Sequence, residues 1–184
     1  MVRRGVIGVV GASGTGLQQV TCLVDRWGGG ISQAIGTGGH DLHRDVGGIS
    51  ILQGLKVLAT DPSTSVIVLI SKPPSPEVAV KVMEAAGRAS KAVVVNFLGA
   101  DPDRVRHENI YPAVTLEDAA ATAVALANGR TPEGRRVSVT SPSITPFAPR
   151  QRYIRGLYSG GTFCYEASLL LKKKLALPGS AWIG

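Results

Sequence analysis

Near its start the chain reads Val6-Ile7-Gly8-Val9-Val10-Gly11-Ala12-Ser13-Gly14-Thr15-Gly16-Leu17, and the rest of its architecture follows from this stretch. The first half is apolar and rich in β-branched residues, which favour a strand, and the second half is a loop dense in glycine. Leu17, Val20 and Val24 then fall on one face of a helix. Strand, glycine loop and helix in this order are typical of the opening unit of an α/β domain.

The glycine loop has two interpretations. Gly11, Gly14 and Gly16 allow a sharp turn, and Ser13 or Thr15 can cap the helix. The free amides of the first helical turn and the helix dipole make these five residues a candidate phosphate or carboxylate site. Alternatively, the loop is the tight turn of any α/β domain. It is neither a P-loop nor a G-x-G-x-x-G dinucleotide motif.

Strand and helix patterns alternate along the following residues. Further strands are predicted at residues 31–35, 66–70, 92–97 and 110–114, the last interrupted by Pro112. Helices are predicted at residues 46–58, 76–86 and 116–127. This alternation predicts an α/β, flavodoxin-like, doubly wound fold with a five-stranded parallel sheet in the order 2-1-3-4-5.

Helix caps can be predicted from the residues that precede each helical pattern. Asp45 or Ser50 is expected to cap the helix at residues 46–58. Ser75 followed by Pro76 is a strong start signal for the next helix. Thr115 begins a pattern similar to a capping box before the last helix of this domain.

Polar and glycine residues gather where the predicted strands end, and in a doubly wound sheet this edge holds the ligand. His40 is the imidazole on this face, and it is either a catalytic residue or part of a turn. Lys72 is expected to project toward the glycine loop and to neutralise an anion there. The remaining active-face candidates are Gly38, Gly39, Asp41, Ser71 and Asn96.

The pattern changes after the last of these helices. Residues 5–129 form the predicted domain, and residues 130–151, rich in Pro, Ser, Thr and Arg, are a predicted linker. Residues 152–184 repeat the opening unit, with a strand pattern at residues 154–158, a helix at 163–175, and a second glycine loop between them. This second loop consists of Ser159, Gly160, Gly161 and Thr162. We expect this incomplete second copy to lie outside the main sheet.

Composition limits the classes of function. The net charge is +7, but nine Lys and Arg against two Asp and Glu fall in residues 130–184, so the basic character belongs to the tail. The tail has no nucleic-acid motif, and no apolar stretch reaches the roughly 20 residues of a membrane span. Cys22 and Cys164 have no metal-ligand spacing and are expected to be reduced core thiols. We therefore expect a cytoplasmic protein without bound metal that neither binds nucleic acid nor inserts into membranes.

Six segments in order resemble FdrA, whose relatives are similar to succinyl-CoA synthetase and other nucleoside-diphosphate-forming acyl-CoA synthetases. The segments are Gly11-Ala12-Ser13-Gly14-Thr15-Gly16, Ala34-Ile35-Gly36-Thr37-Gly38-Gly39-His40-Asp41, Asp45-Val46-Gly47-Gly48-Ile49, Ser71-Lys72-Pro73-Pro74, Asn96-Phe97-Leu98-Gly99 and Arg155-Gly156-Leu157-Tyr158-Ser159-Gly160-Gly161-Thr162. The resemblance implies a CoA-ligase-type domain in residues 5–129. It also implies that Ser13-Gly14-Thr15 begins a helix that points at a phosphate.

The chain departs from the synthetases at three points. It lacks the Gly-His-Ala-Gly loop that carries their phosphohistidine, and His107 lies in a different context that indicates a surface residue. Lys72 stands where the resemblance implies a glutamate that holds the phosphohistidine. The separate CoA-binding domain of that family is expected to be missing. A phosphate or phosphate ester is therefore the expected ligand, with CoA and nucleotide bound only together with missing domains.

Three hypotheses remain open from the sequence. The first is an acyl-CoA-synthetase-like domain that binds phosphate. The second is a component of a carbamoyltransferase that acts on oxamate and carbamoyl phosphate in allantoin breakdown, a reaction linked to FdrA-like proteins. The third is a non-catalytic fragment or assembly module. Each predicts a small anionic ligand or other subunits, including further copies of the chain, as partners.

Overall fold

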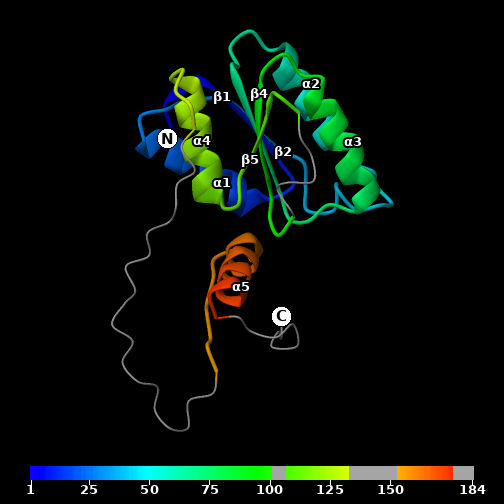
Figure 1. Ribbon diagram of the computed structural model, residues 1–184, viewed down its shortest axis with the longest axis vertical. Helices are drawn as coiled ribbons and strands as arrows, with labels where there is room; N and C mark the ends of the chain where they lie inside the picture. Colours follow the sequence, from blue (N-terminus) through cyan, green and yellow to red (C-terminus); the bar gives the residue numbers. More distant parts are fainter. Residues whose placement is uncertain (101–106, 133–152, 176–184) are drawn as a thin grey trace.

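The computed structural model describes residues 1–100, 107–132 and 153–175. Five parallel strands form one sheet in the order β2-β1-β3-β4-β5, which confirms the predicted fold class (Figure 1). In chain order the elements are β1 (Arg4–Gly11), α1 (Gly14–Arg26), β2 (Ile31–Gly36), α2 (Ile49–Thr60), β3 (Val66–Ser71), α3 (Pro76–Gly87), β4 (Ala92–Phe97), β5 (Ile110–Pro112), α4 (Leu116–Ala127) and α5 (Gly161–Leu175).

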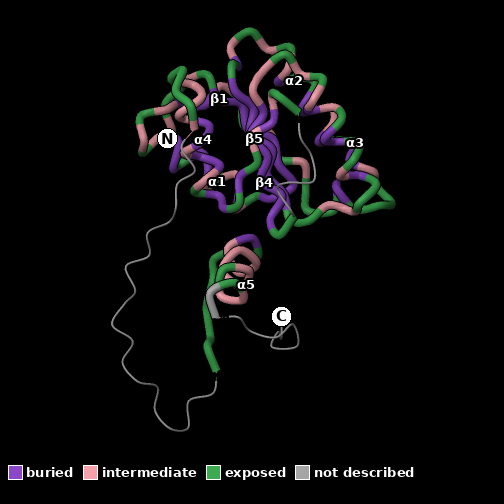
Figure 2. Tube along the Cα trace, in the orientation of Figure 1, coloured by how far each residue is buried: buried purple, intermediate pink, exposed green. Residues whose placement is uncertain are grey.

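Two helical layers enclose the sheet. Helices α1 and α4 cover one face, and α2 and α3 cover the other (Figure 1). The central strand β3 is buried along its whole length, and its side chains alternate between the two layers. Ile67 and Leu69 pack toward α2 and α3, whereas Val68 and Ile70 pack toward α1 and α4. Figure 2 shows that burial is concentrated in the strands of this sheet.

The glycine at the end of β1 is required by the packing of the sheet. A Cβ at Gly11 would lie 2.7 Å from the carbonyl oxygen of Ile70 on the neighbouring strand β3. No real Cβ contact is this short, so only glycine lets the two strand ends approach so closely. The loop that follows β1 is therefore held against the carboxyl end of β3.

Helix α2 starts later than its apolar pattern predicts. Gly47 and Gly48 both have φ of +76°, a left-handed conformation that cannot continue a helix. Neither Asp45 nor Ser50 caps this helix, which corrects the sequence-based prediction. The carboxylate of Asp41 instead accepts hydrogen bonds from the amides of Ser50 (2.9 Å) and Ile51 (2.8 Å).

Strand β5 is shorter than predicted. It ends at Pro112 rather than at Val114. Proline is tolerated here because β5 lies at the edge of the sheet, and the last bond to β4, from the amide of Ala113 to the carbonyl of Val95 (2.8 Å), does not need the N–H that Pro112 lacks. The other two predicted caps lie in the expected places. Ser75 is the residue before α3, with Pro76 at its first position, and the Thr115 hydroxyl accepts a hydrogen bond from the amide of Asp118.

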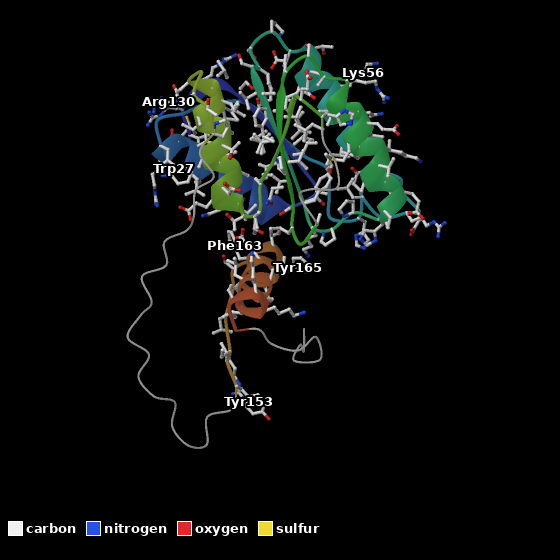
Figure 3. All side chains as sticks on the ribbon, viewed as in Figure 1. Trp27, Lys56, Arg130, Tyr153, Phe163 and Tyr165 are labelled. Carbon is white, nitrogen blue, oxygen red and sulfur yellow. The ribbon has the colours of Figure 1, made fainter. Side chains whose placement is uncertain are left out.

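Helix α5 lies outside the five-stranded sheet and packs against one end of it (Figure 1). Figure 3 shows Phe163 and Tyr165 on the part of α5 nearest the sheet, and Phe163 packs against the core beneath α1 and α4. The predicted strand at residues 154–158 does not form, and Tyr153, Ile154 and Leu157 are exposed. A lone segment cannot satisfy its backbone as a strand without a neighbour.

Two other predictions have different outcomes. Most of the predicted linker, residues 133–151, lies outside the described residues, as do residues 176–184 of the predicted second copy.

Cys22 is exposed on α1 and Cys164 is partly buried on α5, so the expectation of two core thiols is wrong. Cys22 lies on the solvent side because Thr21, Leu23 and Val24 occupy the face turned to the sheet.

Candidate functional site

The first turn of α1, residues 13–16, has open backbone amides, and we call these residues the cradle. The side chain of Ser13 accepts a hydrogen bond from the amide of Gly16 (3.0 Å), and the carbonyl of Ser13 accepts from Leu17 (2.9 Å). The amides of Gly14 and Thr15 have no acceptor within the described part of the chain. A Cβ at Gly14 would meet nothing within 4 Å, so the helix end is open on this side.

The start of α5 lies directly against this cradle. The hydroxyl of buried Thr162 is 2.6 Å from the hydroxyl of Ser13. Gly160 passes so close to Thr15 that a Cβ would overlap the threonine side chain. The structure thus brings together the two glycine loops that the sequence placed in separate copies of one unit. Two helix N-termini, each with a partial positive charge, converge at one place.

Lys72 adds a full positive charge to this place. The position that a Cβ of Gly161 would occupy lies 3.3 Å from the Lys72 ammonium nitrogen. Lys72 forms no ion pair with any described residue. Two helix N-termini and an ammonium group repel one another unless an anion lies between them. The predicted role of Lys72, the neutralisation of an anion at the first glycine loop, stays a prediction.

Three buried polar atoms at the same edge of the sheet lack a hydrogen-bond partner. They are the Thr37 hydroxyl after β2, the Ser75 hydroxyl after β3 and the side-chain oxygen of Asn96 in β4. Among described residues these are the buried side-chain atoms without partners, and all three follow or end a strand. A buried polar group left unpaired costs about 1–3 kcal/mol. Their concentration at the ligand edge of the fold is what a site for a polar ligand requires.

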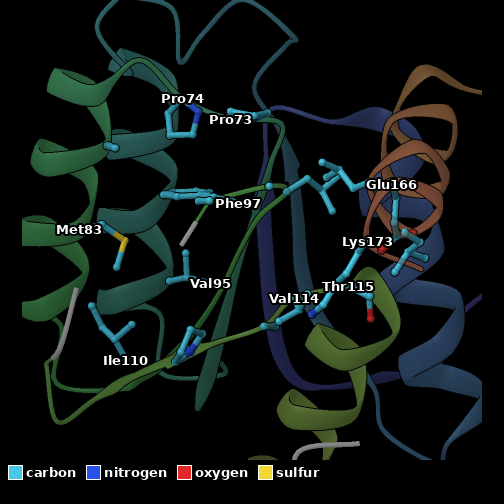
Figure 4. A pocket seen from close by; sticks show the side chains of 18 of the residues that line it. Pro73, Pro74, Met83, Val95, Phe97, Ile110, Val114, Thr115, Glu166 and Lys173 are labelled. Carbon is cyan, nitrogen blue, oxygen red and sulfur yellow. The ribbon is translucent and has the colours of Figure 1, made fainter. Parts of the chain in front are cut away.

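A pocket of about 650 Å³ lies beside the cradle. Figure 4 shows Met83 of α3 and Val95 and Phe97 of β4 on one side, with Glu166 and Lys173 of α5 on the other. Pro73 and Pro74, which follow Lys72 directly, connect the pocket to the cradle. Such a pocket is within the usual size range of small-molecule sites.

Glu166 anchors α5 over this pocket. Its carboxylate accepts a hydrogen bond from the amide of Leu116 (2.7 Å), the first residue of α4. Burial raises the pKa of Glu166, and nearby Glu117 adds to this effect, while the hydrogen bond from Leu116 opposes it. The carboxylate therefore lies at the N-terminus of α4, where the helix dipole stabilises a negative charge.

Residues 3–99, more than half of the chain, match the model of the CoA binding domain family. The chain belongs to this family. The matched segment runs from β1 to the end of β4 and contains the cradle loop, Lys72 and Asn96.

This CoA-binding domain protein is also similar to the uncharacterised protein YahF of Escherichia coli strain K12. The two are 42% identical over 177 residues, which cover 94% of this chain and 34% of YahF. The chain therefore spans about a third of the length of this relative.

The family match corrects one sequence-based expectation. The resemblance to synthetases implied that the CoA-binding domain was missing from the chain, yet residues 3–99 match that domain. The error arose because both domain types begin with a strand, a glycine loop and a helix, so the local pattern of residues 6–17 does not distinguish them.

The active-face candidates after β2 divide into different roles. Asp41 is buried and caps α2, so its place is structural. His40 is exposed and its ring lies 4.7 Å from that of His43, in the turn that also contains Gly38 and Gly39. No hydrogen bond or ring contact joins His40 to the cradle residues in the described segments. Its catalytic role stays a prediction.

The candidates after β3 and β4 lie in the sheet edge itself. Ser71 is buried and its carbonyl accepts a hydrogen bond from Leu98 (3.0 Å). Asn96 donates to the carbonyl of Ala113 (3.0 Å), and its buried side-chain oxygen has no partner among the described residues. Sequence reasoning did not assign Thr37 or Glu166 to the site. The hydroxyl within the glycine turn at residues 36–39 could have indicated Thr37, whereas the place of Glu166 depends on how α5 packs.

Two kinds of feature are absent from the described residues. No group of three or more His, Cys, Asp and Glu side chains there could hold a metal ion. None of the helices in those segments is long and apolar enough to span a bilayer.

Proposed function

We propose that this CoA-binding domain acts in acyl-CoA synthetase chemistry of the FdrA type, with a phosphate group of its ligand held in the cradle. The observation that carries the proposal is the convergence of the N-termini of α1 and α5 with Lys72. Unpaired amides and an ammonium group are the donors that bind phosphate in proteins. CoA and acyl phosphates both carry a phosphate group that these donors could bind.

The affinity of the cradle for free phosphate is expected to be low. A contact with a helix end contributes about 0.3–1 kcal/mol when exposed and up to about 2 kcal/mol when partly buried. Two helix ends and one lysine therefore support a Kd of about 1 mM, which corresponds to about 4 kcal/mol. Tighter binding of CoA would come from contacts outside the cradle, including the unpaired polar atoms of Thr37, Ser75 and Asn96.

Isothermal titration calorimetry with inorganic phosphate and with CoA tests the proposal. Lys72→Glu should weaken both at least tenfold, because it places a negative charge beside the anion. Lys56→Glu is the matched control, since Lys56 is exposed on α2 in the opposite layer (Figure 3). Gly14→Val should also weaken binding, because its side chain extends into the open side of the cradle. Unchanged affinity in both Lys72→Glu and Gly14→Val would refute the phosphate site.

Carbamoyl transfer is a second candidate, and one observation favours it. The cradle can hold an acyl phosphate, but the sequence has no Gly-His-Ala-Gly loop to receive its phosphoryl group. A carbamoyltransferase needs a carbamoyl phosphate site and no phosphohistidine. If carbamoyl phosphate binds through Lys72 and CoA does not bind at all, this second function replaces the first.

A further inference from the structure

The pocket beside the cradle differs from it in chemistry. Its walls are made mostly of hydrocarbon side chains, among them Met83, Val95, Phe97, Ile110 and Leu169. The few polar groups are Thr115, Glu166 and Lys173. The hydroxyl of Thr115 already accepts a hydrogen bond from the amide of Asp118, and Lys173 is exposed. The interior therefore offers apolar surface and few free hydrogen-bond partners.

The pocket and the cradle are joined by two elements. Helix α5 starts at the cradle with Thr162 and lines the pocket with Leu169, which lies about 10 Å further along the helix axis. On the opposite side, Lys72 of the cradle is followed at once by Pro73 and Pro74 of the pocket. One ligand with an anionic head and an apolar arm can occupy both.

An arm that carries amides would fit this pocket poorly. Each buried amide without a partner loses its hydrogen bonds to water, and the lining has too few groups to replace them. A hydrocarbon arm has no hydrogen bonds to water to lose, and its burial against the aromatic and aliphatic walls lowers the free energy of the complex. The lining thus favours an acyl chain over the polar arm of the cofactor itself.

Glu166 gives the pocket a second kind of selectivity. Its carboxylate lies within the wall and is fixed by the amide of Leu116. A ligand carboxylate brought into the same partly desolvated space would be repelled by it. Lys173 also lines the pocket, but this residue is exposed, so solvent screens its charge and weakens its attraction for a ligand carboxylate.

From these observations we infer that the pocket binds the hydrocarbon chain of an acyl group, and that Glu166 excludes acyl groups that end in a carboxylate. The inference rests on the proposed function for the phosphate end of the ligand. It assigns the substrate class: monocarboxylic acyl groups with an apolar chain, and not dicarboxylic ones such as succinyl.

Calorimetric titration of the whole chain with CoA and with acetyl-, butyryl-, hexanoyl-, octanoyl- and succinyl-CoA tests the inference. The Kd should fall by up to about fourfold for each added methylene group until the pocket is full. Succinyl-CoA should bind no more tightly than CoA. Equal affinity for every acyl length, with CoA binding intact, would overturn the inference and leave the proposed function standing.

Free octanoate, butyrate and succinate form a second arm that does not depend on CoA. If no CoA compound binds, the proposed function fails. The pocket is then judged on the free acids alone, where octanoate should bind more tightly than butyrate and succinate should not bind. Equal binding of all three acids, or of none, would overturn the inference.

Two variants connect the effect to the pocket. Leu170→Asp places a charge in the lining at a side chain that is 38% exposed, so folding should be retained. It should abolish the dependence on chain length. Val80→Asp is the matched control, because Val80 is 56% exposed on α3 and does not line the pocket. Glu166→Gln should raise the affinity for succinyl-CoA relative to that for butyryl-CoA. If Glu166→Gln leaves the discrimination intact, the assigned role of Glu166 is wrong.

Discussion

The hydroxyl of Ser13 lies 2.6 Å from the hydroxyl of Thr162, although 149 positions separate them in the sequence. Ser13 already accepts a hydrogen bond from the amide of Gly16, so its own proton is available for Thr162. The residue that caps α1 is thus also the residue that receives α5. Completion of the anion cradle and docking of α5 are therefore one structural event.

Thr162→Val should loosen the docking of α5. Valine keeps the shape of threonine but removes the hydroxyl, while Ser13 keeps its bond to Gly16. A lost hydrogen bond of this kind costs about 1 kcal/mol, so the population with α5 undocked should rise about fivefold. Amide hydrogen exchange along α5, followed by mass spectrometry, measures this population directly.

The control for this prediction is Thr21→Val. Thr21 is also buried and donates to the carbonyl of Gln18 within α1. The Thr21→Val variant should change the global stability of the domain. The rate of amide hydrogen exchange in α5, relative to that in the sheet, should stay the same. If the two variants give the same exchange in α5, the Ser13–Thr162 contact does not hold this helix.

Asp41→Ala should destabilise the domain by about 1–3 kcal/mol. The carboxylate is buried and is the acceptor for two amides at the start of α2, where the residue at the capping position, Gly48, has no side chain. Loss of a side-chain cap and of buried acceptors has this cost. Urea denaturation measures the free energy of unfolding, and Asp41→Asn should show a smaller loss because its amide oxygen still accepts one bond. A loss below about 0.5 kcal/mol in Asp41→Ala would mean that Asp41 acts at the ligand site rather than in the fold.

The difference between Asp41 and Asp45 illustrates how far the sequence could be used. The strands and helices follow from the hydrophobic periodicity of the sequence. The order of the strands in the sheet follows from the alternation of strands and helices, because few topologies are compatible with it. The cap of α2 does not follow, since Asp41 reaches the helix across a turn with two left-handed glycines. Local spacing in the sequence predicted Asp45 as the cap of α2. The backbone conformation at Gly47 and Gly48 instead places Asp41 at the start of this helix.

The candidate site, too, followed from the sequence only in part. The position of the cradle and of Lys72 at one edge of the sheet could be predicted, because the carboxyl ends of neighbouring parallel strands must lie side by side. The position of α5 could not, because the repeat at residues 154–162 indicated a strand that would need a neighbour. Only the packing of Phe163 and Thr162 against the first copy shows that the second glycine loop lies against the first.

Glu166→Gln should change the pH dependence of stability. Burial raises the pKa of Glu166 above its ordinary value of 4.5, so the folded chain holds this proton more tightly than the unfolded chain. The corresponding stability is complete below pH 4.5 and is lost as the pH rises through the raised pKa of the folded state. Glutamine can still accept from the amide of Leu116 but does not titrate.

Melting temperatures of the native chain and Glu166→Gln, measured between pH 4 and pH 8, test this sign. The variant should gain stability relative to the native chain as the pH increases from about 4.5. Curves that stay parallel over the whole range would mean that Glu166 is solvated and that α5 does not cover it.

No histidine of this chain should become phosphorylated during incubation with labelled ATP or GTP and a carboxylic acid. The chain has three histidines. His107 lies against Gly87, which precedes β4, so it is at the edge of the sheet opposite to the cradle. His40 and His43 pack on each other in an exposed turn and make no contact with the cradle residues that the structure describes. A phosphate in the cradle thus has no imidazole within the bonding distance that transfer requires.

The measurement of this prediction is the amount of acid-labile label per mole of protein, with a chain denatured beforehand as the blank. Stoichiometric label on His40 or His107 would contradict the placement of the phosphate and would make phosphoryl transfer, rather than binding alone, the activity of this domain.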